Sequence, residues 1–578
     1  MQKMVYKLTA VLTALVLAVA GALTVLLTAP FTVNALSPAT SGNRGMHNYS
    51  RWASTVKSYL YSDGDVLVRV ECIGVSNVIV EQYSKEFQLL SSQTLSLELP
   101  VWGGFYAGED ANYIICGQTN EEENNNKEVI RVVKYDKEFH RLGSASLYGA
   151  NTTVPFEAGS LRCDEVNGTL YVRTCHEMYT SDDGLNHQAN MTFSVRESDM
   201  KIMDATYLVE YSGVGYASHS FNQYILVDEE GYLVTLDHGD AYPRGVVLNR
   251  SVYTAGNGEF DGISDSVLVQ YFPGATGDNS TGAAVGGLAE TSSGYLAVYS
   301  ANTAGSGMAK RNVYLSYTPK DRFTGNATVV TQITDYAGTG YSDPSAGNPM
   351  IVPTGPDEGY ILWNDVLAGS SEWDGLPRNT DLHYVTYSSG GKVSSVQTVE
   401  DVWLSDCQPV FVDGKLVWYT TNSGVNQGAP TFYTLDESGL TATAVRSLTS
   451  IEVTSQPDKT VYLEGEKLDS TGLEVTAYYD NGTAEVIEGY TLSGFDSSRL
   501  GQQTVTVSYQ GFTASFSVTV EQEQVLLYDY NRDNVEDVLD VMWLAQQVVD
   551  ESAKPAQDLN QDGVVDVLDV MTLAKRIV

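Results

Sequence analysis

The stretch GYLVTL, residues 231–236, has a form that returns along most of the chain. A glycine marks a turn, and apolar residues then follow with the two-residue period of a β-strand. Helical periodicity is nearly absent from residues 43–446, so this region is predicted to be almost entirely β. The related stretches begin at Gly64 (GDVLVRV), Asn112 (NYIIC), Gly168 (GTLYVRT), Gly231, Gly294 (GYLAVY), Gly359 (GYILW) and Gly414 (GKLVWY).

The spacing of these seven stretches indicates how the strands are organised. Successive starts lie 48, 56, 63, 63, 65 and 55 residues apart, a repeat length that is typical of radially packed sheets. YSKEF at Tyr83 and YDKEF at Tyr135 lie 52 residues apart and indicate equivalent outer strands in the first two units. Residues 43–446 are therefore predicted to form a β-propeller of about seven blades. The alternatives are a propeller of six or eight blades and two separate β-sandwiches.

A second, smaller β module is predicted at residues 448–520. Short alternating strands are separated there by turn signals, and the length suits a small sandwich. YLEGEKLD (Tyr462–Asp469), GLEVTAYYDNG (Gly472–Gly482) and GQQTVTVSY (Gly501–Tyr509) resemble a bacterial Ig-like domain. The resemblance implies a β-sandwich that acts as a spacer, with sugar binding as the alternative. Gly482, Gly501 and Gly511 are interpreted as turn residues.

The C-terminal tail contains one loop pattern twice, offset by 29 residues: DYNRDNVEDVLD from Asp529 and DLNQDGVVDVLD from Asp558. Loop positions 1, 3, 5, 9 and 12 carry side-chain oxygens, and the carbonyl at position 7 can complete a shell around a hard cation. Gly563 and its counterpart Asn534 stand at position 6, where a positive φ is needed. Two Ca²⁺ ions are predicted, held by Asp529, Asn531, Asp533, Val535, Asp537 and Asp540, and by Asp558, Asn560, Asp562, Val564, Asp566 and Asp569.

After each loop the apolar residues change to helical spacing, but no comparable helix precedes either loop. In these respects residues 526–578 resemble a type I dockerin, a small α-helical module that docks on a cohesin domain of a scaffoldin. The resemblance implies attachment to a cellulosome-type assembly. It places partner contacts at Val538, Leu539, Val567, Leu568, Lys575 and Arg576, although Gln546 and Gln547 replace the basic pair in the first copy. The alternative for the four apolar residues is that they pack between the two helices.

The N-terminus and the composition indicate the compartment. Lys3 and Lys7 precede an apolar run, and small residues end at Ala35, so residues 1–35 are predicted to be a signal peptide of a secreted, extracellular protein. An uncleaved anchor is the alternative. The formal charge of −39 disfavours nucleic acid as a partner, because phosphate is repelled. Of the five cysteines, Cys163 and Cys175 flank one predicted hairpin and could pair.

Polar residues gather in the propeller where second strands are expected to end and where inner strands begin. These two places lie on the same face of a blade, so their side chains are predicted to converge around the mouth of the central channel. Candidate catalytic residues are His176, His219, His238, Arg173, Arg244, Tyr242, Asp240 and Glu177. The three histidines could instead hold a divalent metal. A further alternative is an ordinary polar channel mouth without a function.

Two chemistries suit this predicted cluster. A polysaccharide lyase needs a base and a cation for a uronate carboxylate, for which the histidines and Arg162, Arg173 or Arg244 are candidates. A glycoside hydrolase needs two carboxyl groups, for which Glu177, Asp240, Asp365 and Asp406 are candidates. The chain is therefore predicted to be a secreted subunit that binds cohesin and degrades or binds plant polysaccharide. The alternative is a non-catalytic carbohydrate-binding or structural scaffold component.

Overall fold

The computed structural model describes residues 37–44, 53, 55–212, 214, 220–228, 230–239, 244–254, 256–272, 282–302, 310–337, 343–368, 375–376, 381–422, 427–480, 482–522 and 526–577. The chain divides into two compact units. One contains Leu36–Ser447, and the other contains Met1–Ala35 together with Leu448–Val578. The predicted signal peptide lies outside the described residues.

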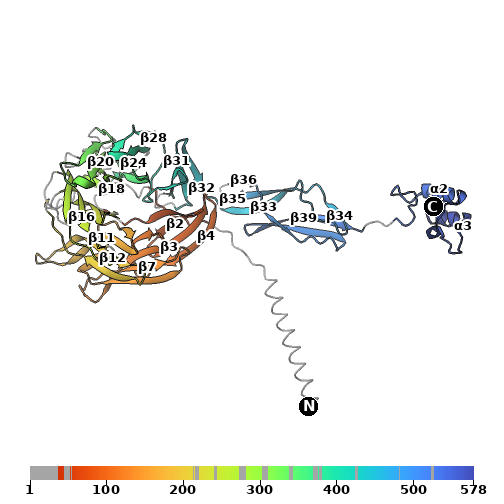
Figure 1. Cartoon of the computed structure of the whole chain (residues 1–578), viewed down its shortest axis with the longest axis horizontal. Coiled ribbons are helices and arrows are strands. Elements are labelled where there is room, and N and C mark those ends of the chain that lie inside the picture. The colour runs from red at the N-terminus through yellow and green to blue at the C-terminus, as the bar shows by residue number, and fades with distance from the viewer. Residues whose placement is uncertain are drawn as a thin grey trace, which may run out of the picture. The chain divides into compact units, whose positions relative to one another are not determined.

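The described residues of the larger unit form seven antiparallel sheets in chain order, with strands of each labelled in Figure 1. The first sheet contains β1 (Ser58–Asp63), β2 (Val66–Ile73), β3 (Asn77–Ser84) and β4 (Leu89–Ser96), and the second contains β5 (Val101–Ala107), β6 (Asn112–Gly117), β7 (Glu128–Tyr135) and β8 (Arg141–Tyr148). The third contains β10 (Arg162–Val166), β11 (Thr169–Thr180), β12 (Asn186–Arg196) and β13 (Lys201–Thr206), and β9 (Thr152–Pro155) pairs with β11.

The fourth sheet contains β14 (Ser220–Val227), β15 (Tyr232–Gly239), β16 (Gly245–Val252) and β17 (Asp265–Tyr271). The fifth contains β18 (Ala283–Glu290), β19 (Gly294–Ala301), β20 (Asn312–Pro319) and β21 (Val329–Gln332). In the sixth, β22 (Pro344–Ala346), β23 (Met350–Gly355) and β25 (Gly375–Leu376) pair with β24 (Glu358–Ala368), followed by β26 (Leu382–Ser388), β27 (Lys392–Val393) and β28 (Gln397–Val399). The seventh is β29 (Val410–Val412), β30 (Lys415–Thr420), β31 (Thr431–Asp436) and β32 (Gly439–Ala444).

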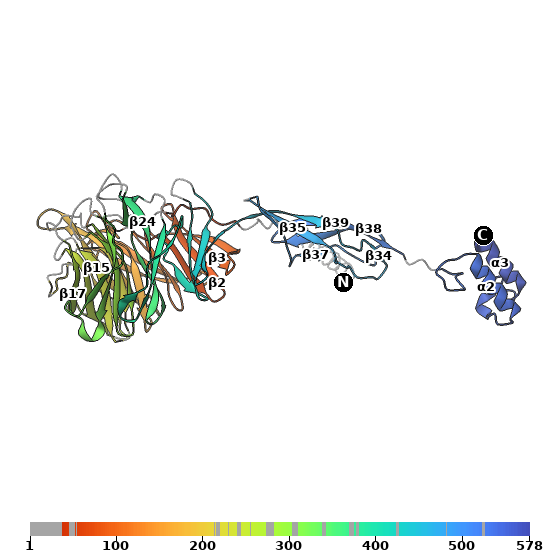
Figure 2. The same cartoon turned by 90° about the horizontal axis from the view of Figure 1, so that it is seen from above.

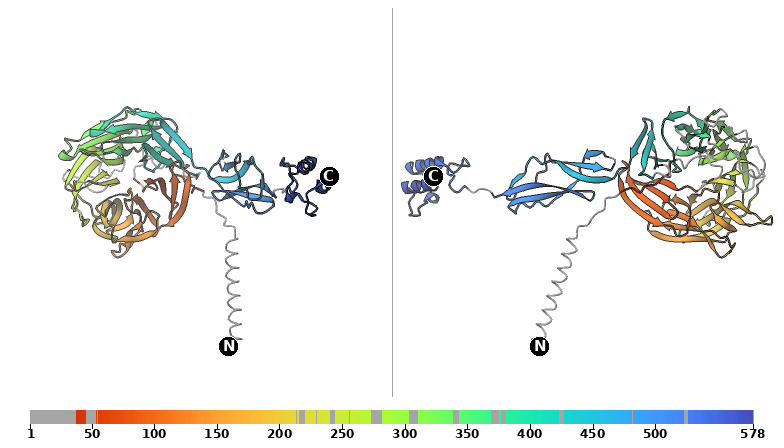
Figure 3. Two further views of the ribbon diagram at one scale, coloured as in Figure 1. Left: turned by 45° about the vertical axis from the view of Figure 1, so that its right-hand side comes forward. Right: turned by 180° about the vertical axis from the view of Figure 1, so that it is seen from behind.

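These sheets follow one another around a ring, with the first beside the seventh (Figure 3). Each of the seven G-x-L-x-V stretches is the second strand of its sheet, so the described residues confirm a seven-bladed β-propeller. The YSKEF and YDKEF stretches occupy the same turn between third and fourth strands. Phe87 and Phe139 both have a φ of 65° there. Apolar side chains between neighbouring sheets form the cores, as in the cluster of Val234, Leu248, Val267 and Tyr299 from blades four and five.

The ring is closed between its first and last blades. Residues 37–44 run along this junction, and Ser41 forms an isolated antiparallel bridge with Gly428 of the seventh blade. Arg69 of β2 is fully buried and lies 2.8 Å from both Glu71 and Glu81. The Tyr419 hydroxyl of β30 donates to Glu71 at 2.9 Å. A buried ionic cluster therefore joins the two blades.

The module that begins at Leu448 is a sandwich of two sheets, seen edge-on in Figure 2. Its core contains Tyr462, Val475, Val505 and Phe516. Gly482, Gly501 and Gly511 have φ of 80°, 99° and 85°, which confirms their interpretation as turn residues. One sheet contains β33 (Leu448–Ser455), β35 (Glu474–Tyr479) and β36 (Ala484–Val486); the other contains β34 (Val461–Leu463), β37 (Thr491–Ser493), β38 (Gly501–Tyr509) and β39 (Phe512–Glu521), with β34 parallel to β39.

The last residues form two α-helices, α2 (Val538–Val549) and α3 (Val567–Ile577), that pack against each other. Leu544 and Leu573 are fully buried, as the helical spacing predicts. Short 3₁₀ turns occur at η1 (Lys320–Arg322), η2 (Ser389–Gly391) and η3 (Pro555–Gln557). All five cysteines are free thiols, so Cys163 and Cys175 do not pair. Among the described residues, no helix is long and apolar enough to cross a membrane.

Candidate functional site

The two C-terminal loops have the same hydrogen bonds at equivalent positions. The Asp529 carboxylate accepts from the backbone N–H groups at loop positions 5 and 6, at 3.0 and 2.9 Å. The Asp558 carboxylate accepts from the same positions of the second loop, at 3.2 and 2.9 Å. At position 12, Asp540 accepts from the N–H groups of positions 3 and 9, and Asp569 does the same. Each loop is thus folded around its own carboxylates.

The backbone of the loops also agrees with the sequence analysis. Asn534 and Gly563 at position 6 have φ of 69° and 93°, as predicted. Arg532 and Gln561, two residues earlier, also have positive φ, at 63° and 60°. The positive φ at position 4 was not predicted, because neither Arg nor Gln is typical of that backbone conformation. The two loops therefore share their backbone conformation despite different residues at both positions.

The donors in these loops suit a hard cation. Every side chain at positions 1, 3, 5, 9 and 12 offers an oxygen, and calcium prefers carboxylate and carbonyl oxygens. Asp540 and Asp569 are fully buried. Although burial raises it, backbone N–H donors hold the pKa of Asp569 below its usual range. That carboxyl is therefore ionised at neutral pH, which is the form that binds a metal.

Apolar side chains lie exposed at the start of both helices. The described residues do not support packing of Val538, Leu539, Val567 and Leu568 between the helices, since each is at least 49% exposed. Met542 and Met571, one turn further along, are 62% and 52% exposed and were not singled out from the sequence. Two equivalent apolar faces result, one of Val538, Leu539 and Met542 and the other of Val567, Leu568 and Met571.

The basic pair at the end of α3 is divided between two roles. Lys575 is exposed. The Arg576 guanidinium lies over the Tyr528 ring, 5.2 Å from the ring centroid, and donates a hydrogen bond to the Tyr528 hydroxyl. This contact joins residues 48 positions apart and fastens the start of the module to its end. Both side chains are exposed, but Arg576 is held by Tyr528, whereas Lys575 is not.

The structure corrects the predicted positions of the catalytic candidates in the propeller, because β11 is longer than expected. The residues Arg173–Glu177 were expected where this strand ends, but β11 continues to Thr180 and is flanked by β9 and β12. His176 is consequently fully buried inside the sheet. Its Nδ1 lies 2.7 Å from the Thr152 hydroxyl and its Nε2 lies 3.0 Å from the Tyr207 carbonyl. Burial lowers the pKa of His176 to about 4, so the ring is neutral and both nitrogens are engaged.

Other members of the predicted cluster are also interior. Arg173 pairs with Asp237 of the next blade at 2.7 Å and donates to the Thr192 hydroxyl, and His238 is buried with its ring 5.8 Å from that of Phe272. Arg244 is 3% exposed. Glu177 is half-buried and accepts from the Thr153 hydroxyl at 2.6 Å. His219, Asp240 and Tyr242 lie outside the described residues.

These positions do not bring the described residues together as a catalytic or metal site. Within the described part of the propeller, a possible three-ligand metal group occurs only at Asp136, Glu138 and His140, on an exposed turn. It includes neither His176 nor His238. The described histidines and arginines of the predicted cluster instead pack within and between blades.

A cavity of about 200 Å³ lies where the inner strands of the blades meet. It is lined by residues from the inner strand of each of the first six blades and by the residues just before β29, with Gly286 as the only described residue contributed by the fifth blade. The cavity therefore occupies the central channel of the propeller. Its polar lining includes Tyr59, Tyr106, Arg162, Tyr224 and Asp406.

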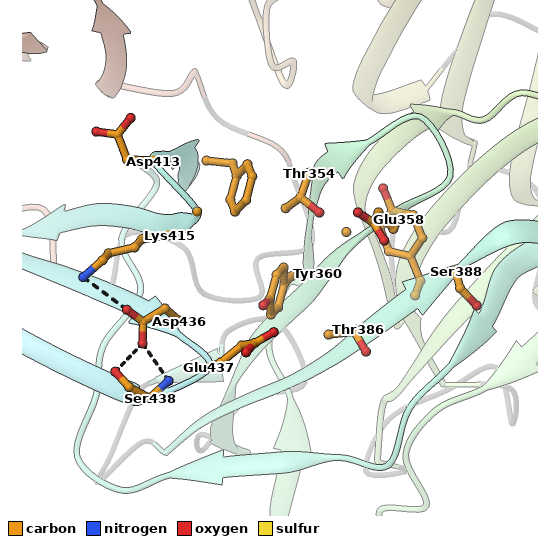
Figure 4. A pocket seen from close by; sticks show the side chains of 14 residues that line it. Thr354, Glu358, Tyr360, Thr386, Ser388, Asp413, Lys415, Asp436, Glu437 and Ser438 are labelled. Atoms are coloured by element: carbon orange, nitrogen blue, oxygen red, sulfur yellow. Dashed lines mark hydrogen bonds and ion pairs between the residues drawn. The ribbon is translucent and has the colours of Figure 1, made fainter. Parts of the chain in front are cut away.

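A larger groove of about 710 Å³ lies between the sixth and seventh blades, at the ends where strands turn back as hairpins. This is the opposite end of the strands from the predicted channel mouth. The ring of Tyr360 projects into the groove between Glu358 and Glu437 (Figure 4), and Phe411 is 40% exposed beside it. Hydrogen bonds from Ser438 and the ion pair with Lys415, 3.1 Å away, lower the pKa of Asp436 to about 2. The groove combines apolar rings with fixed negative charge.

Sequence reasoning missed this groove because its residues look like ordinary hairpin turns. Asp413–Gly414 and Glu358–Gly359 are turn dipeptides, and they were interpreted as the starts of strands. The remaining signal was the acidic character of these turns, including Asp436–Glu437.

Comparisons with known proteins identify the middle module. Residues 455–520 match the family model of the bacterial Ig-like domain (group 3), which confirms the predicted Ig-like domain. Pectate lyase L of Thermoclostridium stercorarium is 39% identical over 82 residues, 14% of this chain and 7% of that protein. An exo-beta-1,6-galactobiohydrolase of Bifidobacterium longum subsp. longum is 43% identical over 86 residues, 14% of this chain and 6% of that protein. The chain thus spans under a tenth of the length of these relatives.

Among solved structures, the α-L-arabinanase of Penicillium chrysogenum is 12% identical and covers 58% of this chain and 94% of its own, with a TM-score of 0.33. The α-L-arabinanase of Cellvibrio cellulosa is 9% identical and covers 51% and 93%, with a TM-score of 0.28. The cobalt-substituted ACO of Synechocystis is 9% identical, covers 60% and 65%, and has a TM-score of 0.27. Scores this low support no inference about activity.

Proposed function

We propose that this chain is a secreted subunit that attaches to a cohesin domain through a calcium-dependent dockerin and brings its propeller to plant polysaccharide. The observation that carries the proposal is the matched geometry of the two C-terminal loops, each with five oxygen-bearing side chains and the same backbone bonds. Calcium supplies positive charge that offsets the carboxylates of each loop. The ligands are the twelve residues named from the sequence.

The exposed apolar faces favour a docking role for this module. A solvated helix pair has no need for three exposed apolar side chains at the start of each helix, and contiguous apolar surface is typical of interaction sites. The two faces are equivalent, with Val538, Leu539 and Met542 matching Val567, Leu568 and Met571. Either face can therefore present the same chemistry to a partner. We infer two alternative orientations of docking on one cohesin.

Titration of the full chain against a panel of immobilised cohesin domains tests this attachment. We expect binding to at least one cohesin in Ca²⁺ and its loss in EDTA. Changing Leu539 and Leu568 together to Asp is expected to abolish binding, whereas Leu185→Asp, on an exposed propeller loop, is the control. The proposal is contradicted if the chain stays bound to the cohesin domain in EDTA, or if the double variant still binds it.

For the propeller we propose a carbohydrate-active role centred on the groove between the sixth and seventh blades. Aromatic rings beside hydrogen-bonding groups suit the apolar and hydroxyl faces of a sugar, and the Tyr360 and Phe411 rings lie beside Glu358 and Glu437 in this way. The volume of about 710 Å³ is within the range for ligand sites. The names of the two relatives, a pectate lyase and a galactobiohydrolase, are consistent with such a role.

Incubation with pectic and hemicellulosic polysaccharides distinguishes the forms of this role. Absorbance of unsaturated uronate ends indicates a lyase, new reducing ends alone indicate a hydrolase, and retention without either indicates a binding module. Tyr360→Ala is expected to reduce whichever of these is observed, product release or polysaccharide retention. Tyr148→Ala, which removes an exposed ring elsewhere on the propeller, is the control. A Tyr360→Ala protein that matches the unmodified protein on every substrate contradicts the groove as the site.

A further inference from the structure

The central cavity contains a cation without a carboxylate partner. Arg162 of β10 lies deep in the propeller yet keeps some accessible surface, because it lines the cavity. Its guanidinium lies over the Tyr224 ring at 4.7 Å, and it donates to the Leu161 carbonyl at 2.9 Å and to the Tyr224 hydroxyl at 3.3 Å. Among the described residues it forms no ion pair. An interior charge without a counter-charge costs several kcal/mol, so this site favours an anion.

An unsatisfied acceptor lines the same cavity. Asp406 is 8% exposed, and its Oδ2 accepts from the Lys57 N–H at 2.7 Å. Its Oδ1 meets no donor in strict hydrogen-bond geometry among the described residues, although Ser58 lies near enough to stabilise the carboxylate. A buried acceptor without a donor is unfavourable by about 1–3 kcal/mol, so Oδ1 favours a ligand or water that donates to it.

The rest of the wall suits a small ligand with a ring. Tyr59, Tyr61 and Tyr106 contribute aromatic surface, and Gln408, which also lines the cavity, is exposed. At about 200 Å³ the cavity is smaller than the sites that hold drug-sized ligands. It therefore has room for a single sugar ring rather than for a length of polysaccharide.

We propose that the central channel binds one sugar acid, such as a free uronate, with its carboxylate on Arg162 and a hydroxyl group donating to Asp406. Arg presents a planar fork that matches a carboxylate, and Asp406 Oδ1 can accept from a hydroxyl. The choice of a sugar acid rests on the proposed carbohydrate role, whereas the anion site itself does not. This site is separate from the groove, whose lining residues belong to other segments of the sixth and seventh blades.

Calorimetric titration of the full chain with D-galacturonate, D-galactose and acetate tests the proposal. The two sugars differ only in the carboxylate, and acetate is a carboxylate without the ring. We expect D-galacturonate to bind at least about 10-fold more tightly than either of the others, the range for one hydrogen bond to a charged group. Equal binding of galactose or acetate overturns the proposal, and so does a cavity that takes up none of the three and holds water alone.

Variants assign the binding to the cavity. Arg162→Lys keeps the charge but not the fork and is expected to weaken D-galacturonate binding by about 10-fold or more. Arg196→Lys, whose exposed guanidinium pairs with Asp199 at 2.6 Å, is the matched control and should not change it. Asp406→Asn has the same shape and gives a second test if Arg162→Lys does not fold. Binding that is unchanged in both cavity variants overturns the proposal.

Failure of the channel site and failure of the proposed function can be told apart by experiment. Cohesin binding depends on the C-terminal loops, and the response to polysaccharide is tested at Tyr360, so neither assay involves Arg162 or Asp406. A protein that passes both assays but does not bind D-galacturonate refutes the channel site alone. A protein that binds D-galacturonate but fails both assays retains the channel site and loses the proposed function.

Discussion

The C-terminal loops and the central cavity both contain carboxylate groups, but the chain builds them in opposite ways. Each loop draws its donors from twelve consecutive residues, and backbone N–H groups of the same loop hold its carboxylates. The cavity is lined by residues from all seven blades, and among the described residues Asp406 Oδ1 meets no donor in hydrogen-bond geometry. A local site is thus recognisable from spacing and satisfied by its own backbone. A site assembled from several blades depends on the whole ring, and here it leaves a polar atom for a ligand to pair with.

The largest expected effect concerns the local sites. Asp540→Ala or Asp569→Ala removes the buried carboxylate at position 12, so we expect Ca²⁺ affinity at that loop to fall by more than about 100-fold, beyond what outer-shell changes cause. Calorimetry with Ca²⁺ measures it. Asp550→Ala, just after α2, is the control. If loss of one loop also abolishes uptake at the other, the two loops are not independent and the comparison needs revision.

The next effect concerns the assembly of the ring. Arg69→Met leaves Glu71 and Glu81 buried without their cation, so we expect a loss of about 3–5 kcal/mol in the free energy of unfolding of the propeller. Denaturant unfolding of the full chain measures the change. Arg196→Met breaks an exposed pair and should cost no more than about 1 kcal/mol. Similar losses in both variants contradict a special role for the buried cluster.

A smaller, pH-dependent effect is expected at the cavity. Burial raises the pKa of Asp406 to about 6, so the folded protein keeps a proton there that the unfolded chain releases near pH 4. The contribution of this carboxyl to stability is complete at low pH and is lost as pH rises through about 6. Asp406→Asn should therefore gain stability relative to the unmodified protein over this interval, by at most about 3 kcal/mol. Denaturant unfolding between pH 4 and pH 8 measures the difference, and a constant difference contradicts the raised pKa.

The smallest effect is expected from one docking face alone. Leu568→Asp leaves the face of Val538, Leu539 and Met542 intact, so we expect cohesin affinity to fall by less than about 10-fold, below 1.4 kcal/mol. Surface plasmon resonance with the same cohesin measures it, with Leu539→Asp as the symmetric partner. Complete loss from either single substitution shows that the faces are not equivalent.

The same contrast explains what the sequence predicted. The period-2 stretches located the second strand of every blade, because a strand after a turn is a local property. The loop ligands and the positive φ at Asn534 and Gly563 follow from fixed spacing. His176 was misplaced because the length of β11 depends on pairing with β9, which is not a local property. The cavity and the groove were missed because no short segment contains them, although Arg162 and Asp406 had been noticed individually.

The bridge between Ser41 and Gly428 has a consequence for how the protein is made. The earliest described segment pairs with the last of the seven blades to be synthesised, so the ring cannot close until that blade has left the ribosome. Contacts across such a long separation form slowly, since a large loop must close first. Until then the first blade exposes the surface that later faces the seventh, including Arg69, and the unfinished chain is open to association with other copies.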